Sequence, residues 1–216
     1  MIKGMIFDLD GVIVDTAFYH FKAWQYLAKE INISFDSMFN ETLKGISRSQ
    51  SLERILLHGN KANTFSYEEK QFLMNKKNDF YIKLLWKLTK KNILPGVLSF
   101  IKTANKHKVL CAIASSSQNA GMILKKLNIK KYFDVIVDPL SLSKGKPDPE
   151  IFLSAANLIN VLPDEAVGFE DSQAGIEALN KANIFSVGIS PKKKLIGASL
   201  QVNSFKEINF KKLIRI

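Results

Sequence analysis

Short apolar runs alternate with amphipathic patterns along most of this 216-residue chain, and this alternation restricts the possible folds more than any other feature. Several of the apolar runs are rich in β-branched residues, which favours buried strands. The predicted strands cover residues 5–7, 109–114, 135–137, 166–169 and 184–189. The predicted helices between them cover residues 97–106, 119–127, 149–159 and 172–182. Strand and helix in alternation indicate a parallel sheet with helices on both faces.

Residues 17–91 interrupt this alternation. They contain helical patterns at residues 18–30, 49–57 and 68–88 and no convincing strand, and Pro95-Gly96 then marks the return to alternation. We therefore predict an α/β fold, with a Rossmann-like parallel-sheet core formed by residues 1–16 and 92–216. We call residues 17–91, which follow the first strand, the helical insert. After Pro191 the pattern is weak, and residues 200–205 are expected to add a last strand.

The strongly basic composition does not indicate a nucleic-acid-binding protein. The net charge is +11 and the pI is near 9.6, but only three of the 31 basic residues are arginines and the 28 lysines are scattered along the chain. The run Lys192-Lys193-Lys194 is explained by a solvated loop. A basic footprint without a recognition motif is weak evidence, so we expect no nucleic-acid partner.

Membrane and secreted proteins are also disfavoured. No apolar run approaches the roughly 18 residues that a membrane-spanning helix needs. The first residues run from Met1 to Phe7 straight into acidic residues, without the apolar region and cleavage site of a signal peptide. Cys111 is the only cysteine and lies in an apolar run, which indicates a small buried hydrophobe. We expect a cytoplasmic protein with no membrane partner.

Carboxylates follow two of the predicted strands. Asp8 and Asp10 come after the first strand, and residues two apart in an extended segment point the same way. Gly11 allows the chain to turn away. Glu170 and Asp171 follow the fourth strand, at the same edge of the sheet. Taken singly, Asp8 and Asp10 could be a polar strand end, and Glu170 and Asp171 could cap the following helix. Together, however, four crowded carboxylates repel one another unless a cation such as Mg²⁺ cancels their charge.

Two further features at this edge suit a phosphate group. Ser115, Ser116 and Ser117 follow the second strand where a helix is expected to begin, and hydroxyl and N–H groups at a helix start bind anions. Ordinary helix capping would explain these serines equally well. Lys146 precedes Pro147-Asp148-Pro149, which is expected to hold the chain extended before the next helix. Its ammonium group is a compact charge suited to a phosphate oxygen.

In this order and strand context, Asp8-x-Asp10-Gly11, Ser115, Lys146 and Glu170-Asp171 resemble the four motifs of the haloacid-dehalogenase-like hydrolase superfamily. The resemblance covers nearly the whole chain. It implies that Asp8 is a nucleophile and Asp10 a general acid/base, while Ser115 and Lys146 hold the transferring phosphoryl group. It also implies Mg²⁺ bound by Asp8, Asp10, Glu170 and Asp171, and a helical cap formed by residues 17–91.

Further motifs are similar to those of bacterial β-phosphoglucomutases, which interconvert β-D-glucose 1-phosphate and glucose 6-phosphate through β-glucose 1,6-bisphosphate. The motifs that carry this resemblance are Asp15-Thr16 with His20, residues 44–48, Lys77-Asn78-Asp79, and residues 115–117 with Asn119. The resemblance implies that Thr16 and His20 support Asp10. It implies in substrate or phosphate binding Thr16, His20, Lys44, Gly45, Ile46, Ser47, Arg48, Lys77, Ser115, Ser116, Ser117 and Asn119. Ser47 and Gln50 have the spacing of a capping box, which puts Arg48 in the first turn of a helix, where it could bind a second phosphate.

Three functional hypotheses are compatible with these residues. The first is the phosphomutase, and the second is a Mg²⁺-dependent phosphatase in which water attacks the phosphorylated Asp8. The third is a non-catalytic binding protein with the same fold, which the intact set of site residues disfavours. For the enzyme we expect a small phosphorylated sugar as the only partner and a monomeric state. Acid/base chemistry at Asp10 would require its pKa to be raised.

Overall fold

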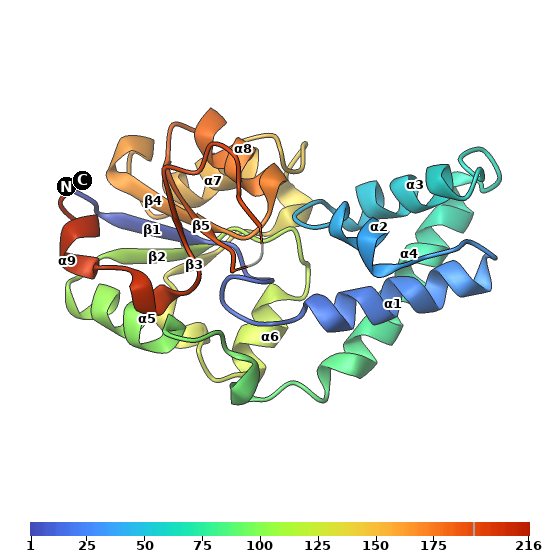
Figure 1. Ribbon diagram of the computed structural model, residues 1–216, viewed down its shortest axis with the longest axis horizontal. Helices are drawn as coiled ribbons and strands as arrows, with labels where there is room; N and C mark the ends of the chain where they lie inside the picture. Colours follow the sequence, from blue (N-terminus) through green and yellow to red (C-terminus); the bar gives the residue numbers. More distant parts are fainter. Residues whose placement is uncertain (192) are drawn as a thin grey trace.

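A parallel sheet forms the centre of the computed structural model, which describes residues 1–191 and 193–216 (Figure 1). Within these residues six strands pair in the order β3-β2-β1-β4-β5-β6, all in parallel. The strands are β1 (Gly4–Phe7), β2 (Leu110–Ile113), β3 (Val135–Ile136), β4 (Ala166–Glu170), β5 (Phe185–Ile189) and β6 (Leu200–Val202). The predicted α/β fold with a parallel sheet is confirmed, and every predicted strand is found.

The chain adds strands first on one side of β1 and then on the other. The first connections lead from β1 to β2 and then to β3, whereas β4 pairs with β1 on its other side. Open α/β sheets bind ligands beyond the carboxyl ends of their strands at such a switch point. Asp8 follows β1 and Glu170 ends β4, so the topology itself brings these two carboxylates together.

Helices cover both faces of the sheet (Figure 1). One face packs against α5 (Val97–Lys106), α6 (Ala120–Lys126) and α9 (Phe210–Leu213) in a cluster that includes Phe7, Phe100 and Phe169. The other face packs against α7 (Glu150–Leu158) and α8 (Gln173–Lys181). Short 3₁₀ helices occupy Lys90–Asn92, Lys130–Tyr132, Pro139–Ser141, Pro163–Glu165 and Phe205–Glu207.

The helical insert lies beyond the carboxyl ends of the strands, on the side opposite the two chain termini (Figure 1). It contains α1 (Ala17–Glu30), α2 (Ser37–Glu41), α3 (Arg48–His58) and α4 (Tyr67–Leu85). Side chains such as Leu27, Leu52 and Ile55 give it an apolar cluster of its own. The parts of α1 and α4 nearest the sheet instead pack into the core, through Ala23 and Tyr81. In the described part of the chain, no helix is long and apolar enough to cross a membrane.

Four local features differ from the sequence-based expectations. Helix α2 was not predicted; its N-cap is Asp36, whose side chain accepts a hydrogen bond from the backbone of Phe39. Helix α4 ends at Leu85, before residue 88. Helix α6 begins at Ala120, so the three serines lie in the loop before it. The expectation about Lys192 lies outside the described residues.

The fourth difference is at Lys146. This segment is not extended as expected: it forms a turn in which the backbone N–H of Asp148 donates to the carbonyl of Gly145 at 3.1 Å. The peptide bond between Lys146 and Pro147 is cis. A turn with a cis proline at its third position is an alternative that the X-Pro sequence leaves open.

Candidate active site

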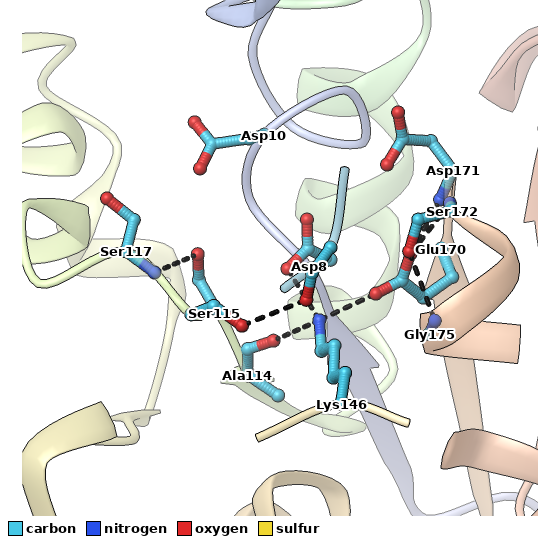
Figure 2. A network of polar contacts seen from close by, with 12 residues as sticks. Asp8, Asp10, Ala114, Ser115, Ser117, Lys146, Glu170, Asp171, Ser172 and Gly175 are labelled. Carbon is cyan, nitrogen blue, oxygen red and sulfur yellow. Dashed lines mark hydrogen bonds and ion pairs between the residues drawn. The ribbon is translucent and has the colours of Figure 1, made fainter. Parts of the chain in front are cut away.

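Asp8 lies at the end of β1, where Lys146 joins it to Glu170 (Figure 2). Lys146 is fully buried, and its Nζ donates to Asp8 Oδ1 at 2.8 Å and to Glu170 Oε1 at 2.6 Å. A third bond, of 3.1 Å, goes to the carbonyl of Ala114 at the end of β2. Three strand ends therefore hold this ammonium group. Asp8 and Glu170 bind strongly to it, which raises the pKa of Lys146 against the opposing effect of burial.

Asp8, Glu170 and Asp171 form a compact acidic cluster. Each offers a carboxylate oxygen within 4.8 Å of the others. With Lys146 beside them, the three carboxylates leave a formal charge of −2 when all are ionised. Burial raises the pKa of Asp171 to about 7, and the charge of Glu170 adds to this. Burial also raises the pKa of Asp8, against the influence of Lys146. A divalent cation would balance this charge, and carboxylate oxygens are the donors that Mg²⁺ prefers.

The second oxygen of Glu170 is fixed by the chain that follows β4. Glu170 Oε2 accepts hydrogen bonds from the backbone N–H groups of Asp171 and Ser172 and from the Ser172 hydroxyl, each at 2.9 Å. Ser172 also caps α8, because its Oγ accepts from the N–H of Gly175. The start of α8 and the acidic cluster are therefore built by the same residues. This explains why capping and metal binding could not be separated in the sequence.

The carboxylate of Asp10 lies apart from the acidic cluster (Figure 2). It accepts a hydrogen bond from the Thr16 hydroxyl, and His20 Nε2 lies 3.5 Å from its Oδ2. Gly11, with φ +83°, turns the chain between Asp8 and Thr16 as expected. The structure therefore brings Asp8, Glu170 and Asp171 together as candidate metal ligands, and it directs the Asp10 side chain toward the helical insert.

The pKa of Asp10 is lowered in this arrangement, opposite to the shift that acid/base chemistry requires. Burial alone would raise the pKa of Asp10, but the charge of His20, whose Nε2 lies 3.5 Å away, and the hydrogen bond from Thr16 outweigh it. Burial and the nearby Lys77 in turn lower the pKa of His20. Burial and Lys77 thus oppose the His20 charge that favours ionised Asp10, so the protonation of Asp10 and of His20 is linked. The sequence could not show this coupling, because the insert supplies both His20 and Lys77.

Lys77 is buried in the helical insert without a carboxylate in direct contact among the described residues. Only 3% of it is exposed, and its Nζ lies 3.2 Å from His20 Nδ1 and over the rings of Trp24 and Tyr81. Burial lowers the pKa of Lys77 to about 7, and the charge of Arg48 contributes. A buried amine poised between its charged and neutral forms is well suited to an anionic ligand, which would favour the charged form.

The loop between β2 and α6 faces both Asp8 and the insert. Ser115 is buried, and its hydroxyl accepts from the backbone N–H of Ser117 at 3.2 Å. The Ser116 hydroxyl does not point to a strand end; it donates to the carbonyl of Gly45 in the insert at 3.1 Å. Asn119 Nδ2 donates to Asn78 Oδ1, also in the insert, at 2.9 Å. The loop therefore connects the two parts of the molecule.

The predicted capping box at the start of α3 is present. The Ser47 hydroxyl accepts from the N–H of Gln50, and the Gln50 side chain accepts from the N–H of Ser47. Arg48 is consequently the first residue of the helix, and its guanidinium donates to Asn78 Oδ1 at 2.9 Å. Lys44 pairs with the exposed Glu41 at 2.9 Å. Ile46 packs in the apolar cluster of the insert.

A cleft between the core and the insert connects these groups. Its empty volume is about 890 Å³, part of it open to solvent, which is within the range of small-molecule sites. The predicted residues that line it are Asp8, Asp10, His20, Lys44, Gly45, Ile46, Arg48, Lys77, Ser115, Ser116, Ser117, Asn119 and Asp171. Four other predicted residues, Thr16, Ser47, Lys146 and Glu170, are not among the residues that line the cleft. Asn78, from the Lys77-Asn78-Asp79 motif, also lines the cleft, whereas sequence reasoning missed Trp24, Asn40 and Ser51. Ser51 could have been found, because it lies three residues after Arg48 on one helix face.

A family model for haloacid dehalogenase-like hydrolases matches residues 5–189, which include both the strand ends and the insert. The chain belongs to the haloacid dehalogenase-like hydrolase family. The match contains all the motif residues that form the acidic cluster and its lysine, and it confirms the family assignment made from the sequence.

Individual relatives in this family include a phosphomutase and a phosphatase. The chain is 45% identical to the β-phosphoglucomutase of Bacillus subtilis, over 98% of this chain and 94% of that protein. It is 30% identical to a phosphorylated carbohydrates phosphatase of Thermotoga maritima, over 85% of this chain and 82% of that protein. The crystal structure of β-phosphoglucomutase from Clostridium difficile superimposes with a TM-score of 0.96 at 44% identity, covering 100% of this chain and 96% of that chain.

Proposed function

We propose that this chain is a β-phosphoglucomutase, which interconverts β-D-glucose 1-phosphate and glucose 6-phosphate through an aspartyl phosphate and β-glucose 1,6-bisphosphate. The observation that carries the proposal is the cleft, which has Asp8 and Ser115 on the core side and Arg48 on the insert side. A bisphosphate needs two anion sites, one at each end. The likeness to β-phosphoglucomutases along nearly the whole chain supports glucose as the sugar.

The core side performs the phosphoryl transfer. Asp8 attacks phosphorus in line and forms the acyl phosphate, while the bond to the leaving oxygen breaks. Lys146 engages Asp8 Oδ1 at 2.8 Å, which fixes the carboxylate plane and leaves Oδ2 as the attacking oxygen. Ser115 binds the transferring group at the cleft wall. Little further covalent chemistry is required, so orientation and charge balance provide most of the rate enhancement.

Asp10 serves as general acid and base for the sugar oxygen. It protonates the leaving oxygen in one half-reaction and takes a proton from the attacking hydroxyl in the other. In the absence of a bound ligand, His20 and Thr16 favour the ionised form of Asp10. We propose that Asp10 takes up its proton when His20 is neutral and the sugar has displaced water, because burial then raises the pKa of Asp10.

Mg²⁺ is the proposed cofactor, held by Asp8, Glu170 and Asp171, with the Asp10 side chain outside this set. When bound, the ion neutralises the acidic cluster and the charge of the transferring phosphoryl group. Glu170 keeps one oxygen on Lys146 and the other on the start of α8, so it positions the cluster rigidly. The residues present fit the ion in charge and in donor type.

The helical insert is proposed to act as a cap over the core formed by residues 1–16 and 92–216. Arg48 and Lys77 from residues 17–91 contact the distal phosphate and the sugar, together with Asn119 of the core loop. A cap that closes over the cleft keeps water from the phosphorylated Asp8. A phosphorylated sugar is the only partner that this chemistry requires, and we propose a monomeric cytoplasmic enzyme.

Phosphorus NMR of the reaction products tests the mutase proposal. With Mg²⁺ and a trace of glucose 1,6-bisphosphate as primer, β-glucose 1-phosphate should become glucose 6-phosphate, and inorganic phosphate should appear much more slowly. α-Glucose 1-phosphate serves as the matched control substrate and should react poorly. If inorganic phosphate is the main product, the phosphatase hypothesis replaces the mutase.

A further inference from the structure

Hydrogen bonds from one core loop join it to two separate segments of the helical insert. The Ser116 hydroxyl donates to the Gly45 carbonyl at 3.1 Å, and Asn119 Nδ2 donates to Asn78 Oδ1 at 2.9 Å. Gly45 precedes α3, whereas Asn78 belongs to α4. The family resemblance implies both Ser116 and Asn119 in substrate or phosphate binding, but in this structure both side chains contact the insert. Ser116 has a contact with the insert through its hydroxyl, and this contact requires no ligand.

The backbone of Gly45 is shaped for this contact. Its φ is +78°, a conformation that a residue with a Cβ rarely adopts, and a Cβ there would lie 2.2 Å from Ser172 Oγ. The insert loop therefore fits between two core segments, with Ser172 against its Cα and Ser116 on its carbonyl. Within the described part of the chain, Ser116 provides the hydrogen bond that the Gly45 carbonyl accepts. Without it, this half-buried carbonyl would depend on water.

Behind this loop, Ala174 of α8 packs against the apolar cluster of the insert, and a hollow lies beside this contact. The hollow, with an empty volume of about 610 Å³, partly open to solvent, separates α2 and α3 from α8 and is lined by Glu41, Arg54 and Glu177. The ion pair that crosses it joins Lys193 to Glu41 at 3.7 Å between exposed side chains, and such pairs contribute little. The hydrogen bond of Ser116 therefore adds a directional contact to a small apolar one on this side of the cleft.

We propose that Ser116 is a specificity-determining residue that latches the cap over phosphorylated Asp8 and so favours a sugar hydroxyl over water as acceptor. This inference rests on the proposed mutase function. Water reaches the acyl phosphate when the cap is open, whereas sugar transfer takes place when it is closed. The strength of the latch sets the fraction of open molecules. Hydrolysis gives inorganic phosphate and regenerates the Asp8 carboxylate, with the oxygen supplied by water.

Ser116→Ala removes this one neutral hydrogen bond. Such a bond contributes a modest net stabilisation, which corresponds to a change of roughly 2- to 10-fold in the ratio of open to closed molecules. The ratio of phosphate release to glucose 6-phosphate formation should rise by the same factor. Ser116→Thr keeps the hydroxyl and should remain near the wild-type ratio. Ser141→Ala is the matched control, because it removes a serine-to-carbonyl bond of 2.8 Å to Asp138 within a core segment outside the cleft.

Phosphorus NMR with β-glucose 1-phosphate measures both products at once. An increased ratio in Ser116→Ala alone supports the latch, and an unchanged ratio overturns it. If both reactions instead slow together while the KM for the bisphosphate rises, Ser116 contacts phosphate and the latch is wrong. If wild-type protein makes no glucose 6-phosphate, the mutase proposal fails by itself, and a distance measurement then decides about the latch.

That distance measurement uses spin labels on Leu57→Cys in α3 and Leu162→Cys in the core, both exposed positions. Cys111 is buried and burial raises the pKa of its thiol to about 12, so it should stay unlabelled. In this background Ser116→Ala should increase the long-distance population roughly 2- to 10-fold relative to the short one. Identical distance distributions with and without the substitution would overturn the proposal, whatever the reaction catalysed.

Discussion

Replacement of Lys146 by methionine tests the charge balance on which the site depends. Methionine has a similar length and keeps most of the apolar contacts of the lysine stem, but it cannot donate a hydrogen bond. In the native protein Lys146 is fully buried and its ammonium group contacts Asp8 at 2.8 Å and Glu170 at 2.6 Å. The substitution therefore leaves two buried carboxylates without their cation.

Removal of one partner from a buried ion pair costs about 3–5 kcal/mol of the free energy of unfolding. Protonation of the carboxylates limits this loss. Burial already raises the pKa of Asp8, and Lys146 is the main group that opposes this rise. Without the lysine the pKa of Asp8 should rise further, so that folded protein binds a proton more tightly than unfolded protein does. The stability of the variant relative to wild type should therefore increase as the pH falls.

Urea unfolding without Mg²⁺, at about pH 8 and about pH 5, measures both effects. Lys146→Met should lose most stability at the higher pH and part of it at the lower pH. Lys144→Met is the matched control. Lys144 is exposed and pairs with Asp148 at 3.6 Å, and loss of this pair should change the free energy of unfolding by no more than about 0.5 kcal/mol. Equal urea midpoints for Lys146→Met and wild type, or a loss of stability that does not depend on pH, would show that Lys146 does not balance the charge of these carboxylates.

Three further predictions concern the cleft. Asp10→Asn should slow the mutase roughly 10²–10⁴-fold in steady-state assays, and should affect acyl phosphate hydrolysis least; an equal loss on both substrates would contradict an acid/base role. Arg48→Ala should lower kcat/KM for the bisphosphate by an amount equivalent to about 2–5 kcal/mol, and should change kcat/KM for a small acyl phosphate little. Equal losses for the two substrates would exclude a distal phosphate site at Arg48. Because burial raises the pKa of Asp171 to about 7, protons compete with the metal below that pH. The increase in Tm on adding Mg²⁺ should thus grow between about pH 5 and about pH 8, and a constant increase would argue against the acidic cluster as its site.

Regular elements with strong patterns were predictable from the sequence. Helix α5 has the predicted bounds, because Val97, Phe100, Ile101 and Ala104 form one buried stripe with helical spacing. The capping box at Ser47 was equally predictable, since it depends only on residues three apart. The ends of β1 and β4 also meet as expected, because a parallel sheet brings its carboxyl ends to one edge.

Features that depend on contacts between distant segments could not be predicted. The family resemblance implied that Thr16 and His20 support Asp10, but nothing in the local pattern shows that the Asp10 carboxylate turns away from that of Asp8. The Ser116 hydroxyl contacts a backbone carbonyl 71 residues away, which no side-chain pattern can reveal. Lys77 belongs to a helix with many lysines, and only the packing of α1 against α4 shows that it is buried.

Transfer of a labelled phosphoryl group from Asp8 tests the central claim most directly. The enzyme is phosphorylated with a ³²P-labelled acyl phosphate and Mg²⁺, and the label is mapped to Asp8, with Asp8→Asn as the unlabelled control. A single turnover with excess β-glucose 1-phosphate follows. We expect most of the label to move to glucose 1,6-bisphosphate, with little in inorganic phosphate. Label that stays on the protein, or that appears only as inorganic phosphate, would contradict the mutase function.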